Sequence, residues 1–96
     1  MSNPQRPAVT DQVTAGPGGA MTVEVGVITG DLMVRTADTG QGTATISVQY
    51  AGADEWYELQ GSPVPLPADS LATVHRAVVE AIRAGGATCV PSPGRT

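Results

Sequence analysis

The chain has 96 residues, a formal net charge of −4, and one cysteine, one histidine and one tryptophan, with no lysine. At this length one domain is the limit, a single cysteine excludes an internal disulfide, and no stretch approaches the roughly 18–20 apolar residues of a membrane span. The few arginines are scattered, so neither direct nucleic-acid binding nor attachment to an anionic membrane is expected. The first residues do not resemble a secretory leader, and we expect a cytoplasmic protein.

The beginning of the chain differs in composition from the rest. Residues 1–20 are rich in proline and glycine and carry few large apolar side chains. Such a segment buries too little surface to offset the entropy of ordering it. The sequence therefore predicts a disordered N-terminal tail over residues 1–20, a single folded domain over residues 21–88 and a flexible C-terminal tail over residues 89–96.

The middle of the chain shows the period-two alternation of β-strands. Residues 22–28 place three valines on one face, and residues 32–35 follow a short turn as the partner strand of a hairpin. Residues 43–50 alternate apolar side chains with Thr, Ser and Gln. One apolar and one polar face predict an antiparallel sheet with one side in water.

The next hairpin has mutually exclusive registers, because a shift by one residue moves every side chain to the other face. The register that opposes Tyr50 to Tyr57 and Val48 to Leu59 keeps one face apolar, and we favour it. Trp56 then falls on the polar face of the sheet.

A helix is expected near the C-terminus. Alternating prolines at 63–67 end the sheet, Asp69 or Ser70 caps the helix, and Gly85-Gly86 stops it. Its apolar positions share one arc. They are Leu71, Val74, Val78 and Ile82. The predicted fold class is α+β: an antiparallel four-stranded β-meander packed on one C-terminal α-helix.

Few residues could carry chemistry. His75 lies within the apolar arc and could be a general base or a metal ligand, but no ligand spacing or nucleophile accompanies it, which favours a hydrogen-bonded core histidine. Cys89 follows the end of the helix, where the helix dipole disfavours a thiolate. The sequence therefore predicts no catalytic, cofactor-binding or metal-binding residues, no cofactor and no enzymatic activity.

A protein-binding surface is the more promising feature. Tryptophan is enriched at interface hot spots, and Trp56 is expected on the polar sheet face beside an acidic loop. Two simpler interpretations remain: residues 61–67 or a tail could cover Trp56, and the acidic residues could belong to an ordinary solvated loop. The candidate partner-binding residues are Trp56, Glu58, Gln49, Asp54 and Glu55.

Self-association is also expected, because so small a core supplies little stability and symmetric dimers are the commonest oligomers. The sequence predicts a homodimer. One route uses a sheet edge at residues 32–35 or 56–60, which we slightly favour. The other uses a strip of small residues on the helix: Val74, Ala77, Ala81 and Ala84.

One short stretch suggests a family. It consists of Val23-Glu24-Val25, Gly30-Asp31, Val34-Arg35 and Asp38. These residues resemble part of a family of small actinobacterial regulatory proteins encoded beside helix-turn-helix regulators, relative to which residues 43–66 would be an insertion. The resemblance implies a hairpin, a short strand and a helix, and a regulatory protein partner.

Three functions stay open from the sequence. The favoured one is a small acidic, non-enzymatic interaction protein that regulates a protein partner, such as a transcription regulator or a toxin; exposure of Trp56 would support it. A ligand-binding or accessory module of a bacterial biosynthetic pathway would need a closed apolar pocket between sheet and helix. An enzyme would need a cleft that brings His75 near Asp or Glu side chains.

Overall fold

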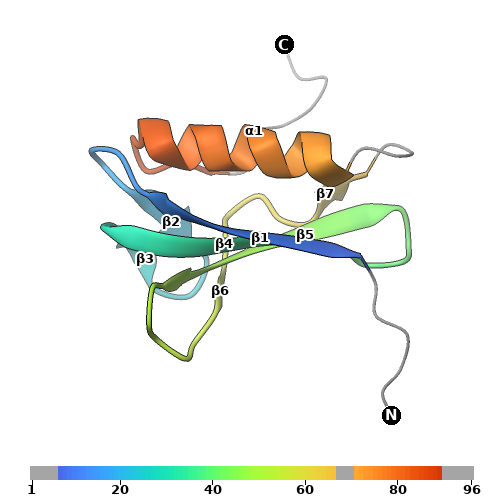
Figure 1. The fold of residues 1–96 in the computed structure, drawn as a ribbon, viewed down its shortest axis with the longest axis horizontal. Coiled ribbons are helices and arrows are strands. Elements are labelled where there is room, and N and C mark those ends of the chain that lie inside the picture. The colour runs from blue at the N-terminus through green and yellow to red at the C-terminus, as the bar shows by residue number, and fades with distance from the viewer. Residues whose placement is uncertain (1–6, 67–70, 90–96) are drawn as a thin grey trace.

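The computed structural model describes residues 7–66 and 71–89, and these form an antiparallel sheet with one helix across one of its faces (Figure 1). The predicted α+β class with a single C-terminal helix is confirmed over these residues. The elements are β1 (Ala8–Thr14), β2 (Ala20–Thr22), β3 (Gly26–Ile28), β4 (Asp31–Asp38), β5 (Thr43–Tyr50), β6 (Tyr57–Glu58), β7 (Val64–Pro65) and α1 (Leu71–Ala84).

The sheet is not the four-stranded meander expected. Its main part has five strands in the order β1-β4-β5-β6, with β7 also paired to β5, while β2 and β3 form a separate two-stranded hairpin. All these pairings are antiparallel. The helix packs over β1 and β4.

The core lies between α1 and the sheet. Alternate residues of β4 and β5 point toward the helix, as the period of two requires, and meet the buried stripe of α1. Side chains with no exposed surface fill this space: Leu32, Val34, Ala44, Ile46, Val48, Leu59, Val78 and Ile82.

The N-terminal part of the domain corrects the predicted tail. Over residues 8–20 that prediction is wrong, because β1 pairs along its whole length with β4 and Val13 is buried. Beyond the strand, the backbone N–H of Gly16 donates to the carbonyl of Ile82 at the end of α1, at 2.9 Å. Much of what orders this segment is main-chain pairing, which leaves little trace in side-chain composition. Residues 1–6 lie outside the described residues.

The strand expected over residues 22–28 is a tight hairpin instead. The Thr22 hydroxyl donates to the Gly26 carbonyl at 2.7 Å and accepts from the Val25 N–H at 3.1 Å, which closes the turn. Gly26 has a φ of 77°, a value that suits glycine. The chain therefore reverses in the middle of the alternating run, and its three valines are exposed rather than buried. They are Val23, Val25 and Val27.

Both sheet edges expected from the sequence are occupied. Residues 32–35 belong to β4, which lies between β1 and β5. Residues 56–60 are flanked by the β2–β3 hairpin, because the N–H of Val23 donates to the carbonyl of Glu58 and the N–H of Gln60 donates to the carbonyl of Met21, both at 2.9 Å.

The register of β5 with β6 differs from the favoured one by two residues. Val48 opposes Tyr57, not Leu59, and Ser47 opposes Glu58. A shift of two residues preserves which face each side chain occupies. Leu59 therefore still reaches the core, and Glu58 still lies on the face opposite to the helix.

The helix has the predicted extent and ends where Gly85 and Gly86 both adopt positive φ, at 83° and 84°. On the proposed small-residue strip, Val74 and Ala81 are half-buried while Ala77 and Ala84 are exposed. The expected cap at Asp69 or Ser70 lies outside the described residues. Within residues 7–66 and 71–89, no helix has the length and apolar character needed to cross a membrane.

The correction at β1 generates a stability prediction. A chain that begins at Met21 loses β1, which exposes one edge of β4 and removes Val13 from the core. We expect it to lose cooperative thermal unfolding, measured by circular dichroism. A chain that lacks only residues 2–6 keeps β1 and should change the free energy of unfolding by less than about 0.5 kcal/mol. Equal stability of the two shortened chains would contradict the assigned role of β1.

Candidate functional site

His75 is buried and joins three elements through its ring. It projects from α1, with 5% of its surface exposed, and its Nε2 lies 2.8 Å from Oδ2 of Asp11 on β1. Its Nδ1 lies 2.8 Å from the hydroxyl oxygen of Thr36 on β4. The expectation of a hydrogen-bonded core histidine is thus met, and both of its partners come from distant parts of the sequence.

The chemistry of the three groups makes this chain of hydrogen bonds self-consistent. An ionised carboxylate only accepts, so Nε2–H donates to Asp11. In the neutral ring Nδ1 then accepts the hydroxyl hydrogen of Thr36, and in the protonated ring Nδ1–H donates to the hydroxyl oxygen. Every polar atom of the ring is satisfied in either form, which permits its burial.

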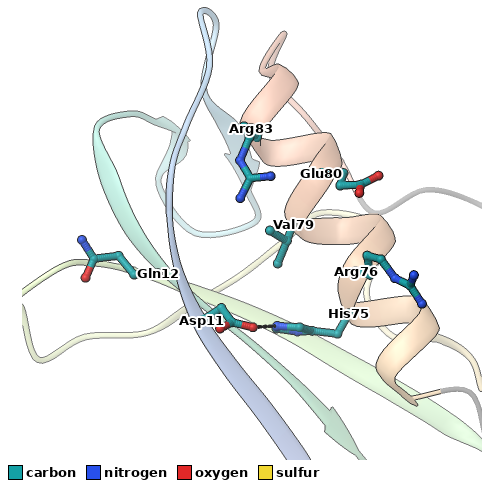
Figure 2. Close-up of a pocket in the computed structure, with 7 residues that line it drawn as sticks. All are labelled: Asp11, Gln12, His75, Arg76, Val79, Glu80 and Arg83. Atoms are coloured by element: carbon teal, nitrogen blue, oxygen red, sulfur yellow. Dashed lines mark hydrogen bonds and ion pairs between the residues drawn. The ribbon is translucent and has the colours of Figure 1, made fainter.

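A hollow of about 340 Å³ opens beside the hydrogen-bonded side chains of Asp11 and His75, between β1 and α1. Asp11 and His75 line it and meet between β1 and α1, as Figure 2 shows. Its lining carries two carboxylates and two guanidinium groups, so its charge is balanced. The lining residues are Asp11, Gln12, His75, Arg76, Val79, Glu80 and Arg83.

The order carboxylate, imidazole, hydroxyl has the pattern of a nucleophilic triad, and the hollow brings His75 beside a carboxylate, the feature that would favour an enzyme. Whether these three side chains could act as a catalytic triad depends on whether the Thr36 hydroxyl is accessible to a substrate. Thr36 has no exposed surface and lies beneath α1, so its oxygen cannot meet a substrate in the hollow. The carboxylate end faces outward instead, since the Asp11 side chain is 60% exposed. The two hydrogen bonds of His75 therefore hold β1 and β4 against the helix.

The predicted partner-binding residues gather on the β5–β6 hairpin, at the far edge of the sheet from β1. Gln49 lies in β5, Glu58 in β6, and Asp54, Glu55 and Trp56 in the segment between them. Trp56 is 39% exposed and is one of the largest apolar side chains in contact with solvent. We call this set, together with Glu24, the Trp56 surface.

Glu24 joins the Trp56 surface through a contact that no pattern in the sequence indicated. Its Oε1 accepts the backbone N–H of Glu58 at 2.9 Å, from the turn of the β2–β3 hairpin. Glu55 is also held in place, since its Oε1 accepts the hydroxyl of Tyr57 at 3.0 Å. Two carboxylates of the Trp56 surface, those of Glu24 and Glu55, are therefore held by hydrogen bonds.

The acidic side chains near Tyr57 change the pKa of its phenol. The hydrogen bond to Glu55 raises the pKa of the Tyr57 phenol above its ordinary value of 10.0, and burial and the negative charges nearby raise it further. The phenolate would lose that hydrogen bond and would be repelled by Glu55 and Glu24.

Sequence reasoning did not find the partners of His75. A polar residue in an apolar arc predicts that hydrogen-bond partners exist, but it does not say which residues they are. Asp11 also lay in the segment expected to be disordered. Cys89 is exposed and free, with its Sγ 3.7 Å from Oε1 of Gln60. The described residues contain no group of three or more His, Cys, Asp or Glu side chains arranged to hold a metal ion.

Comparison with protein-family models, with curated proteins and with solved structures finds no match to this chain. The assignment of a function therefore depends on the geometry of the molecule.

The role of Thr36 can be tested by removing its hydroxyl. Thr36→Val keeps the shape of the side chain but leaves Nδ1 of His75 without its partner, and we expect it to lower the free energy of unfolding by about 1–3 kcal/mol. Chemical denaturation measures this. Thr73→Val makes the same change at an exposed site on α1 and should cost less than about 0.5 kcal/mol. Equal effects would contradict the role of the buried hydrogen bond.

The raised pKa of Tyr57 can be followed by absorbance of the phenolate in a Tyr50→Phe background. We expect Tyr57 to titrate above the ordinary pKa of about 10, and Glu55→Gln to lower its pKa. Because the folded-state pKa is raised, the protonated phenol stabilises the fold fully below about pH 10, and this contribution is lost as the pH rises through the folded-state pKa. A pKa unmoved by Glu55→Gln would show that this hydrogen bond is not the main cause.

Proposed function

We propose that the protein is a small acidic interaction module, without enzymatic activity, that regulates a protein partner by binding a basic segment of it at the Trp56 surface. The observation that carries the proposal is the exposure of Trp56 in a segment where hydrogen bonds hold the carboxylates of Glu55 and Glu24 in position.

The chemistry of this surface selects arginine-rich segments. A guanidinium group can stack on the face of an indole and pair with a carboxylate at the same time, whereas an ammonium group does so less well. The partly exposed Trp56, its chain neighbours Glu55 and Glu58, and Glu24, which accepts the Glu58 backbone N–H, supply both kinds of group. The net charge of −4 favours encounter with a basic partner at long range.

Proteins that bind nucleic acid carry basic surfaces, because they must neutralise phosphates. An acidic protein that covers such a surface competes with the nucleic acid for it. A transcription regulator or a nucleic-acid-directed toxin is therefore the class of partner that this surface would suit.

The alternative of a ligand-binding module has less support. The space between α1 and the sheet is occupied by buried side chains, among them Leu32, Ile46 and Ile82. The hollow beside His75 lies at the margin of that interface and has a charged lining.

The proposal is tested by titrating ¹⁵N-labelled protein with an arginine-rich decapeptide. We expect chemical-shift changes at the Trp56 indole and at the amides of Gln49 and Glu58. Trp56→Ala should weaken binding about tenfold or more, as truncation of an aromatic hot spot does. Glu55→Gln should weaken it less and should reduce its dependence on salt.

Two controls separate this site from general charge attraction. Glu80→Gln removes one carboxylate from α1, far from the Trp56 surface, and should leave the affinity unchanged. A peptide with glutamine in place of arginine should not bind. Shift changes centred on Asp11 and Glu80, or equal losses from Glu80→Gln and Glu55→Gln, would overturn the proposal.

A further inference from the structure

The outer side of β1 is a sheet edge that no described strand covers. β1 is seven residues long, and among the described residues it pairs on one side only, with β4. The opposite edge, at β6, is flanked by the β2–β3 hairpin. A strand with an open edge presents backbone groups that can pair with another strand.

The hydrogen bonds at the two ends of β1 identify which backbone groups point outward. The carbonyl of Pro7 accepts the N–H of Asp38, and the N–H of Ala15 donates to the carbonyl of Gly30, both at 2.9 Å. Inward and outward pairs alternate along an antiparallel strand, so the odd-numbered residues of β1 bond to β4. The residues whose N–H and C=O groups point away from the sheet are Ala8, Thr10, Gln12 and Thr14.

The face of α1 above this edge carries charges of both signs. Arg76, Glu80 and Arg83 line the hollow between α1 and β1. The only ion pair among the described residues joins His75 to Asp11, so Arg76, Glu80 and Arg83 have no ionic partner there. A helix face with both signs of charge can complement its own copy, which a purely acidic or purely basic face cannot.

The positions of these charges along the strand define where a two-fold axis would lie. α1 runs in the same direction as β1, since His75 meets Asp11 and Ile82 meets Gly16 further along both elements. The midpoint between Arg76 and Glu80 is three residues past His75. At about 1.5 Å per helical residue and about 3.3 Å per strand residue, it falls just over one strand residue past Asp11, near Gln12.

We propose that two copies of this chain pair antiparallel through β1, around a two-fold axis near Gln12, to form a homodimer with one continuous sheet. Gln12 then faces Gln12 of the second copy, and Thr10 faces Thr14. Arg76 of each copy lies level with Glu80 of the other. An axis at Asp11 would instead place two carboxylates opposite each other, which disfavours that register.

The first test is the oligomeric state of the full chain, measured by sedimentation equilibrium. We expect a dimer with a micromolar dissociation constant. Gln12→Pro removes an N–H that points away from β4, so it should preserve the circular dichroism spectrum and should weaken dimerisation about tenfold or more. The matched control Gln12→Ala shortens the side chain but keeps the N–H, and it should stay dimeric.

Amide exchange in the unmodified chain gives an independent readout. The amides of Thr10 and Gln12 should be protected at high protein concentration and should exchange faster on dilution. Those of Asp11 and Val13 point to β4 and should stay protected at both concentrations. If another part of the same chain covered the edge, Thr10 and Gln12 would be protected at every concentration in a monomer, and the proposal would be wrong.

A helix-mediated dimer is the remaining alternative. Ala77→Glu places a charge on the exposed part of the small-residue strip, on the opposite flank of α1 from the hollow. We expect this variant to remain dimeric. A monomeric Ala77→Glu variant together with a dimeric Gln12→Pro variant would overturn the proposal, as would a strictly monomeric full chain at about 100 μM, far above the expected dissociation constant.

Discussion

The two hydrogen bonds of His75 connect the parts of this fold that lie furthest apart in the chain. Asp11 is on the first strand, Thr36 is on the strand that pairs with it, and His75 is on the C-terminal helix. Because a buried ring nitrogen without a partner is costly, the position of α1 over β1 and β4 is restricted to arrangements that satisfy both atoms. The same bonds hold Asp11 at the margin of the core, where it forms one wall of the hollow.

The two edges of the sheet differ in a way that separates two interaction surfaces. At β6 the edge is covered by the β2–β3 hairpin, and the Glu24 carboxylate accepts a hydrogen bond from the backbone N–H of Glu58. That covered edge carries the exposed Trp56 and its carboxylates. At β1 the edge has no described neighbour. The two surfaces lie at opposite edges of the sheet. Self-association through β1 would therefore leave the Trp56 surface of each copy accessible to a partner.

The sequence predicted well those elements whose type and extent are determined by the pattern of apolar and polar side chains alone. The alternation over residues 43–50 and the apolar arc of the helix correspond to β5 and α1. The alternating run over residues 22–28 misled because Gly26 and the Thr22 hydroxyl turn the chain there. The predicted β5–β6 register was wrong by two residues, although it assigned the side chains to the correct faces of the sheet. The alternation of apolar and polar residues shows which face a side chain occupies, but it is unchanged by a shift of two residues.

For the candidate sites, helical periodicity in the sequence by itself determined that His75 would be buried. The order of residues along the chain determined that Trp56 would be flanked by Asp54, Glu55 and Glu58. Only the tertiary structure decided that Asp11 and Thr36 are the partners of His75, that Glu24 joins the Trp56 surface, and that β1 rather than β4 or β6 has an edge without a described neighbour. The physical reason is that main-chain pairing can join almost any two extended segments. Which segments pair depends on how all the elements pack together, and no local pattern in the sequence of β1 records that outcome.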